Sequence, residues 1–508
     1  MEEPSPSAKS VKIDMEEHPT KKRNKNNNTK KFDVAIIILV TILGGINAGY
    51  HLFISDVITP LLRNDNILNA PFQESFFKYG SISVGCIIGS IVAGYLCDLH
   101  GRKQTLIYGE WIMFLSLAFL QIGNVASIMI FRIIQGIGIG MCNLAIPLYI
   151  SEVIRKNIRG AILVTFSTTT SLGMLLAFLF QIQLQGGPIG PGTLTWRDLN
   201  WVVIAIPVLM YLFTDLIYHL PKSQEWLDLI EKDIKESNAI DDDSDNTNES
   251  SSLLGNNNNN NNNDNNFVID ETLRKNIFQY SNDMISLMKK EEKYYIALLC
   301  AVSIFALNVL SGGNVSMLEF ETLILPTFGS KDTLNWISIG ICHFASSLLA
   351  MLLIDFVGRR PLLLIGSFGV SFFSMIIGVL ISFSPATSAN AFTTIVFFFY
   401  ISLYQVGPGA MLYVLPCELL PSKIRSYGLS IGFAILFFLQ SVVIGIYQIS
   451  DNRTVRTGGV GGVGIWFYIY SVITVVLTGA LLYLIPKDTK RLSLNEIETM
   501  YSKIRKGA

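Results

Sequence analysis

The sequence predicts an all-α membrane protein with twelve transmembrane helices, arranged as two pseudo-symmetric bundles of six. Three observations predict this fold class. Half of the 508 residues are apolar and only 15% are charged, whereas a soluble domain carries about 25% charged residues. The apolar residues gather in stretches of about 20, the length at which a helix crosses a bilayer. Charged signatures in the first half of the chain recur in the second half.

The apolar stretches are long enough to span a membrane. In the first half they cover 33–55, 76–97, 104–124, 126–150, 160–184 and 199–220. In the second half they cover 294–316, 333–355, 361–383, 391–417, 427–449 and 463–485. Because lipid offers no partner for backbone polar groups, these stretches are predicted to be helices rather than strands.

The connections between the stretches alternate in charge. Basic residues gather after the second, fourth, eighth and tenth stretches, and the opposite connections hold few. The positive-inside rule therefore predicts that both termini are cytosolic. A long linker at 221–293 follows the sixth stretch. Its ends have helical patterns, and its middle is acidic and asparagine-rich, a composition that predicts disorder. The expected parts are a cytosolic tail (1–32), an N-terminal bundle (33–220), the cytosolic linker (221–293), a C-terminal bundle (294–486) and a cytosolic tail (487–508).

Three signatures occur twice, in the same order and six helices apart. The run DLHGRK at 98–103 matches DFVGRR at 355–360, and PKS at 221–223 matches PKD at 486–488. Glu152 precedes Arg159 by seven residues, as Glu418 precedes Arg425. Parallel repeats of this kind are a transporter architecture, with the substrate site near the midplane between the halves.

The repeated turns combine acids with bases at constant spacing, which a loop that only fixes topology does not require. We predict that the carboxylates pair with arginines across the cytosolic ends of the bundles and that the pairs break when this side opens. Such pairs should be only moderately strong, as partly exposed pairs are. The predicted coupling and gating residues are Arg132, Asp98, Arg102, Glu152, Arg159, Asp355, Arg359, Glu418 and Arg425.

Several motifs carry a resemblance to a known family. They are the two D-x-x-G-R-[RK] turns, the glycine-rich run 132–140 with its later Pro147, SGGN at 311–314, and PKDTK at 486–490 followed by LNEI at 494–497. On these motifs residues 33–497 resemble the sugar porter family of the major facilitator superfamily. The resemblance implies the major facilitator fold and transport of a hexose-like sugar by alternating access. It implies no cofactor and no metal, and the absence of a P-loop pattern argues against direct use of ATP.

Polar side chains inside the apolar stretches are the candidates for solute binding, because a sugar is recognised through hydrogen bonds. Asn308, Ser311 and Asn314 share a helix face at three-residue spacing. Serine and threonine in membrane helices also bond the preceding turn or join helices, which is the alternative for the cluster at 167–171. The predicted substrate-binding residues are Asn47, His51, Ser167, Asn308, Asn314, His343, Tyr413 and Gln440.

The candidate residues depart from the family's pattern at several sugar-contacting positions. The family's glutamine of the fifth helix aligns with Ser167, a glutamine of the seventh with Asn308, and the tryptophan of the tenth with Tyr413. Shorter side chains at these positions weaken recognition of glucose itself. A hexose is the first expectation, and an atypical sugar, a polyol or another small solute is the alternative.

The choice between facilitated diffusion and proton symport depends on the neighbour of Arg132, a charge inside a membrane helix. In proton-coupled members an aspartate follows the Gly-Tyr pair of the first helix, and here that residue is His51. Repulsion from Arg132 favours a neutral histidine, so we predict facilitated diffusion. Proton-coupled symport is the alternative, and Glu110, Glu319 and Glu321 are further carboxylates able to carry a proton.

Other function classes are less well supported. A sugar sensor that signals without transport would carry a longer C-terminal tail. No nucleophile–base or metal-ligand spacing stands out, so no enzyme is expected, and the net charge of −1 suggests no nucleic-acid partner. The expected partners are a small sugar or polyol, the lipid bilayer and, under symport, protons; the oligomeric state is unknown. We expect the plasma membrane, with an internal membrane as the alternative. Asn452 matches the glycosylation pattern, in a predicted outer loop.

Overall fold

A computed structural model describes residues 27–68, 70–184, 223, 277–290, 292–318, 332–383, 391–457 and 461–485. The predicted sixth transmembrane stretch (199–220), the asparagine-rich tract, Glu319 and Glu321 lie outside these residues. The predictions for the two tails lie almost wholly outside them as well.

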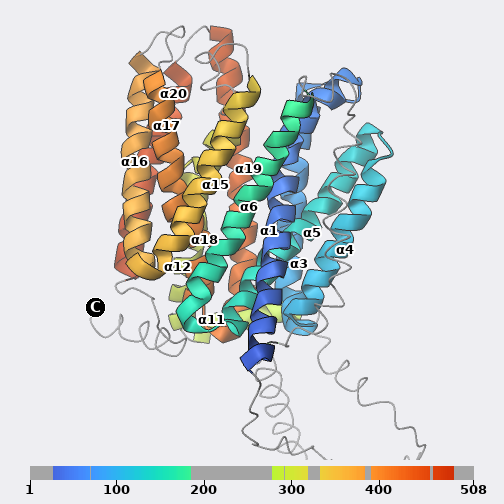
Figure 1. Cartoon of the computed structure of the whole chain (residues 1–508), viewed down its shortest axis with the longest axis vertical. Coiled ribbons are helices and arrows are strands. Elements are labelled where there is room, and N and C mark those ends of the chain that lie inside the picture. Colours follow the sequence, from blue (N-terminus) through green and yellow to red (C-terminus); the bar gives the residue numbers. More distant parts are fainter. Residues whose placement is uncertain are drawn as a thin grey trace, which may run out of the picture.

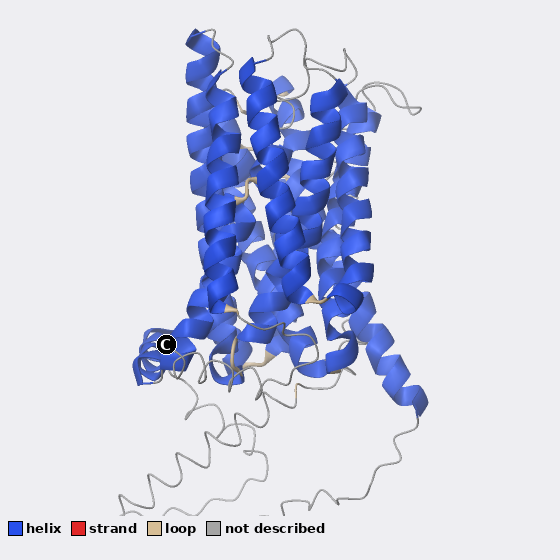
Figure 2. Cartoon of the chain, turned by 90° about the vertical axis from the view of Figure 1, so that its left-hand side faces the viewer, coloured by secondary structure: helices blue, strands red, loops and turns tan. Residues whose placement is uncertain are grey.

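Helices and short turns make up the described residues, and none of these residues forms a strand (Figure 2). Every predicted stretch except the sixth coincides with one or more helices. The first bundle contains α1 (Asn27–Asn64), α2 (Pro71–Ser75), the π-helical turn η1 (Phe76–Gly80), α3 (Ser81–Leu99), α4 (Arg102–Leu120), α5 (Val125–Val153) and α6 (Lys156–Leu184). The second contains α12 (Glu292–Leu310), α13 (Gly313–Leu318), α15 (Asp332–Val357), α16 (Arg359–Phe383), α17 (Ala391–Tyr404), the π-helical turn η4 (Gln405–Gly409), α18 (Ala410–Leu419), the 3-10 turn η5 (Ser422–Ile424), α19 (Arg425–Thr457) and α20 (Gly461–Leu484).

The two bundles stand side by side, and a helix that precedes the second bundle, α11 (Ile277–Lys290), lies at their lower end in Figure 1. The bundles touch mainly where α6 packs on α15 and where α3 packs on α19. These pairs join the fifth predicted stretch to the eighth and the second to the eleventh. The eighth and eleventh stretches are the repeat equivalents of the second and fifth. The interface between the bundles is therefore formed by the same two helices of each repeat.

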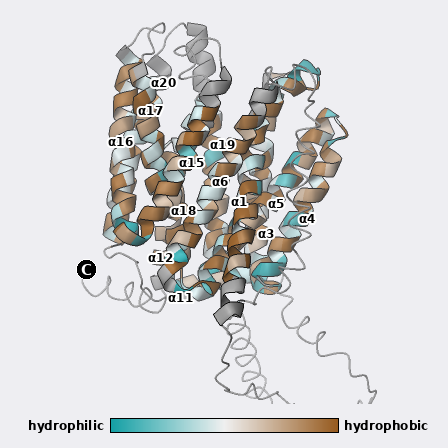
Figure 3. Cartoon of the chain, in the orientation of Figure 1, coloured by the Kyte–Doolittle hydropathy of each residue, from teal (hydrophilic) through white to brown (hydrophobic). Residues whose placement is uncertain are grey.

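Nine helices among the described residues are long and apolar enough to cross a bilayer. Figure 3 shows the hydrophobic residues along the helix bodies, as lipid contact requires. The helix α4 is outside this set and carries Glu110 within its length. A further pair, α11 and α12, passes the same test only jointly and is bent by 111°.

The sequence predicted one continuous helix for the seventh stretch, and this prediction is wrong. The stretch breaks between α12 and α13. Gly312 takes a φ of +80° at the break, a conformation that favours glycine. A Cβ at this position would overlap the ring of Tyr470. The break changes the direction of the chain, so Asn308 before it and Asn314 after it reach the same region.

Two other predicted elements differ from the structure. The tenth stretch is interrupted by the π-helical turn η4, which contains Pro408; proline has no N–H to donate to the helical ladder. Asn452 lies within α19, which continues to Thr457, so the predicted outer loop at this position is wrong.

Candidate functional site

A cavity of about 110 Å³ lies between the two bundles. Both bundles supply its walls: α1, η1, α3, α5 and α6 from the first, and α12, α13, α15, α17, η4, α18 and α19 from the second. A site formed in this way changes shape whenever the bundles move against each other.

Most of the predicted substrate-binding residues lie on this cavity. The break in the seventh stretch brings two of them together, because Asn314 Nδ2 donates to Asn308 Oδ1 at 3.3 Å. Asn308 Nδ2 in turn donates to the carbonyl of Pro408 at 3.2 Å. Their role in binding stays a prediction. The predicted residues that line the cavity are Ser167, Asn308, Asn314, His343, Tyr413 and Gln440.

Gln405 is a cavity residue that the sequence reasoning missed. It is buried in the π-helical turn η4, and its Nε2 donates to Ser167 Oγ at 2.9 Å and to Ser347 Oγ at 3.1 Å. Ser167 belongs to α6 of the first bundle, so the amide joins the two bundles at the cavity wall. A polar residue in an apolar run was the signal that could have identified it.

Two buried polar atoms on the cavity have no hydrogen-bond partner. They are Asn143 Oδ1 of α5 and His343 Nδ1 of α15, whose residues are 2% and 8% exposed. One comes from each bundle. An unpaired buried polar atom costs free energy, so a solute with hydroxyl groups that reached both atoms would remove this cost. Asn143 was not among the predicted residues, although it is a polar side chain inside an apolar stretch.

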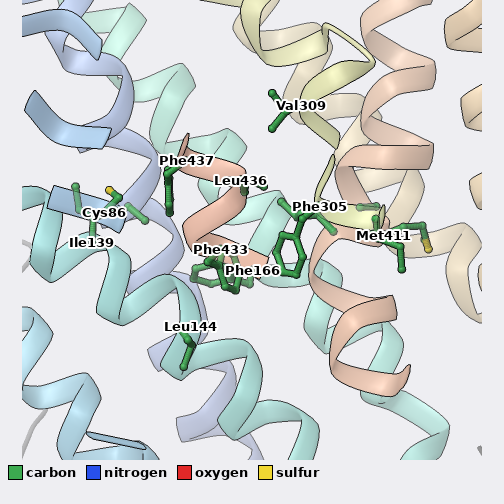
Figure 4. Close-up of a cluster of buried hydrophobic side chains, with 14 of the residues drawn as sticks. Cys86, Ile139, Leu144, Phe166, Phe305, Val309, Met411, Phe433, Leu436 and Phe437 are labelled. Carbon is green, nitrogen blue, oxygen red and sulfur yellow. The ribbon is translucent and has the colours of Figure 1, made fainter. Parts of the chain in front are cut away.

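Aromatic rings from both bundles form part of the cavity wall. Phe53 of α1, Tyr413 of α18 and Phe433 of α19 line the cavity, and the rings of Tyr413 and Phe433 lie 6.0 Å apart. Phe166 of α6 is buried behind this wall and meets the ring of Tyr413 edge to face at a centroid distance of 5.0 Å. Figure 4 shows Phe166 and Phe433 close together beside Leu436 and Phe437. Such rings offer an apolar surface to a solute, in addition to the amides and hydroxyls of the cavity.

Asn47 and His51, although predicted to bind substrate, are not among the residues that line the cavity. Both are fully buried inside the first bundle. The face of α1 that meets the cavity carries Leu52 and Phe53 instead. Asn47 Nδ2 donates to Glu110 Oε2 at 3.0 Å. The four-residue spacing of Asn47 and His51 indicated a shared helix face but not the direction of that face.

Arg132 is also buried in the first bundle. Its guanidinium donates to Gln135 Oε1 at 2.6 Å, to the carbonyl of His51 at 2.8 Å and to Ser55 Oγ. The His51 ring pairs with Gln135 instead, with 2.9 Å between Nδ1 and Nε2. Arg132 therefore contacts the backbone carbonyl of His51.

The predicted gating charges gather at one end of the bundles, which we call the charged end. Within the first bundle Arg102 binds Glu152 at 2.8 Å and Asp98 at 3.1 Å. The second bundle repeats this arrangement at longer distances. There Arg359 binds both Glu418 and Asp355 at 3.4 Å. The residues of the charged end are Asp98, Arg102, Glu152, Arg159, Asp355, Arg359, Glu418 and Arg425.

Each glutamate of the charged end also meets an arginine of the other bundle. Arg159 of the first bundle lies 3.3 Å from Glu418, and Arg425 of the second lies 4.0 Å from Glu152. The side chains of Arg159 and Glu418 are only 4% and 1% exposed. The prediction of partly exposed pairs across the bundles is therefore wrong for the glutamates, because the helix ends that carry them pack against one another.

Asp98 links three parts of the chain. Besides Arg102, it accepts hydrogen bonds from Ser426 Oγ of α19 at 2.7 Å and from the Tyr280 hydroxyl of α11 at 2.5 Å. The Tyr280 ring also packs edge to face on Tyr427 of the second bundle. Burial and the Asp98 carboxylate raise the pKa of the Tyr280 hydroxyl, so this group acts as a donor. The contacts join α3 of the first bundle to α11 and to α19 of the second at the charged end.

Two bundles around a shared cavity, closed at one end by repeated ion pairs, define a membrane transporter of the major facilitator type. The profile described as sugar (and other) transporter matches residues 37–501. The chain therefore belongs to this sugar transporter family, which confirms the family predicted from the motifs. Members of this family are transporters rather than enzymes.

Individual relatives are similar over nearly their whole length. Sugar transporter ERD6-like 17 of Arabidopsis thaliana is 24% identical, covering 94% of each chain. The galactose-proton symporter of Escherichia coli K12 is 22% identical, covering 96% of this chain and 97% of the relative. A solved structure of the proton:xylose symporter XylE, bound to 6-bromo-6-deoxy-D-glucose, superposes with a TM-score of 0.72 at 20% identity, covering 93% of this chain and 99% of that one. The likeness confirms the major facilitator fold.

Proposed function

We propose that this transporter carries a hexose-like sugar or a polyol across the membrane by alternating access. The observation that carries the proposal is the cavity between the bundles, which is lined both by amides and hydroxyls and by aromatic rings. This combination suits a solute with many hydroxyl groups and an apolar ring face. The predicted departures from the family's glutamines keep polyols among the candidates.

The charged end acts as the gate in this proposal. Glu418 and Glu152 each hold one arginine of their own bundle and one of the other. Only the contacts between bundles need to break when this end opens, so each bundle keeps its internal pairs as it rocks. The excess of basic residues supports a cytosolic position for this end and for both termini. We expect the plasma membrane, and we expect a sugar or polyol, the surrounding lipid and, under symport, protons as partners.

Facilitated diffusion is the mechanism that we favour. His51 stands where proton-coupled members have an aspartate, and the buried Arg132 donates to the backbone carbonyl of this histidine at 2.8 Å. Proton symport is the second candidate. It is supported by the similarity to relatives described as proton symporters, such as the galactose-proton symporter and the D-xylose-proton symporter of Escherichia coli K12. A sensor without transport remains the alternative from another class.

Uptake by proteoliposomes tests the proposal. The purified chain is reconstituted and offered labelled hexoses, pentoses and polyols, with and without an inward proton gradient. We expect saturable uptake that the gradient does not drive above the external concentration. Replacing Asn308 by Leu should raise the KM, because it removes an amide from the cavity, whereas Ser303→Ala on the same helix should not, since Ser303 Oγ bonds only Leu299 of its own helix. Uptake of none of these solutes would overturn the proposal, and accumulation driven by the gradient would select symport.

A further inference from the structure

A carboxyl group is buried inside the first bundle, away from the charged end. Glu110 of α4 is 7% exposed. It lies eight residues beyond Arg102 along the helix, or roughly 12 Å at the usual helical rise. An ionisable group within a membrane helix is costly and marks a candidate functional site.

The groups that face Glu110 are neutral hydrogen-bond donors. Asn47 Nδ2 of α1 donates to Oε2 at 3.0 Å, and the Cys142 thiol of α5 donates to Oε1 at 3.5 Å. His51, one turn beyond Asn47 on α1, uses its ring for Gln135, and Cys97 of α3 is the other titratable group near Cys142. No ion pair of the described residues includes Glu110.

The helices α4 and α5 pack closely beside Glu110. A Cβ on Gly109, the residue before Glu110, would lie 2.8 Å from Cys142 Sγ and 3.1 Å from the carbonyl of Gly138. The helices α4 and α5 therefore touch through their backbones. An ionised carboxylate in such a place would pay a large desolvation cost with no opposite charge to repay it.

The amide of Asn47 lacks a hydrogen-bond donor for its oxygen atom. Its Oδ1 atom is buried and has no hydrogen-bond partner, although its Nδ2 atom already bonds the Glu110 carboxyl group. A proton on Glu110 would neutralise the carboxylate and so remove its desolvation cost. The O–H of the neutral acid could also donate to Asn47 Oδ1 and give this atom a partner. An acid and an amide paired in this way exchange two hydrogen bonds.

We propose that Glu110 and Asn47 form a proton-binding site, separate from Arg132 and His51, through which pH acts on α1. The proton resides on the carboxyl group and is shared with the amide of Asn47. Leu52 and Phe53 follow on the same helix and line the cavity. Loss of the proton would place a charge against α1 within two turns of these residues, so the site connects proton binding to the shape of the cavity.

Infrared spectroscopy of the full-length chain in liposomes tests the proposal without any solute. The probe is the proton alone, titrated from mildly acidic to mildly alkaline pH. Glu110→Gln copies the protonated acid, since its amide can exchange the same two hydrogen bonds with Asn47. We expect the difference between wild type and Glu110→Gln to contain the C=O stretching band of a neutral carboxyl group at neutral pH. In Asn47→Leu the band should shift as the O–H loses its acceptor.

Thermal unfolding provides the second readout. A proton held more tightly in the folded state stabilises it at low pH, and this contribution is lost as the pH rises through the titration of Glu110. The Tm of the wild type should therefore fall at alkaline pH more than that of Glu110→Gln. Glu74→Gln is the matched control, because Glu74 is ion-paired with Arg63 at 3.6 Å and should lack the neutral band. A wild-type spectrum without the Glu110 band at neutral pH would overturn the proposal, whether or not the chain transports a sugar.

Discussion

Replacing Glu418 by Gln is expected to open the charged end. Glu418 binds Arg359 of its own bundle at 3.4 Å and Arg159 of the other bundle at 3.3 Å. Because the bundles move as units, the pair with Arg359 exists in both the closed and the open state, and it cancels from the equilibrium between them. The pair with Arg159 exists only in the closed state. Its loss alone therefore sets the size of the effect.

The magnitude follows from that single interaction. A hydrogen bond to a charged group contributes about 1.5–3 kcal/mol, which corresponds to a shift of roughly 10- to 150-fold in the ratio of open to closed molecules. The glutamine keeps the size of the side chain and one acceptor oxygen, so the lower part of this range is expected. The desolvated Arg159, left without its anion, adds to the shift in the same direction.

Cysteine labelling measures the shift. Ser430 of α19 packs against Gly94 of α3 across the two bundles and is 4% exposed. Ser430→Cys, in a background without the native cysteines, should react slowly with a maleimide in the closed state and about tenfold faster with Glu418→Gln. Glu74→Gln is the control, because Glu74 pairs with Arg63, away from the charged end, and its side chain is 25% exposed. Equal labelling rates with and without Glu418→Gln would refute the gating role of the pair.

Three further predictions concern other parts of the molecule. Asn143→Leu should raise the KM for the transported solute about tenfold with little change in the maximal rate, because Asn143 Oδ1 is an unpaired acceptor on the cavity; uptake kinetics measure this, and an unchanged KM would exclude the contact. Gly312→Ala should destabilise the protein by about 1–3 kcal/mol, since φ is +80° there and the Tyr470 ring fills the space; a Tm equal to the wild type would contradict the strain. Tyr280→Phe removes a hydrogen bond to the Asp98 carboxylate, which is worth about 1.5 kcal/mol because the carboxylate is charged but partly exposed. Labelling at the charged end should therefore rise about tenfold, and an unaltered rate would show that α11 does not hold this end closed.

The cavity could be predicted in part, residue by residue. Asn308 and Asn314 were predicted because amides are costly in an apolar helix, and the cavity indeed includes both. Gln405 and Asn143 satisfy the same rule and were overlooked. Asn47 satisfies it too but faces Glu110. Residue type and spacing indicate that a side chain needs a polar partner, but they do not indicate whether that partner is a solute or a neighbouring helix.

The charged end shows a similar division. Repeated motifs were sufficient to predict that Glu152, Arg159, Glu418 and Arg425 act together, because equivalent positions of a duplicated unit meet equivalent neighbours. The depth of burial was predicted wrongly, since it depends on how closely the ends of two separate bundles pack. The sequence alone determined the fold class, the duplication and the family, which follow from apolar length and local motifs. Only the tertiary structure decided which helix faces meet across the bundles and where the cavity lies, because contacts between distant segments depend on helix rotation and packing that no local pattern encodes.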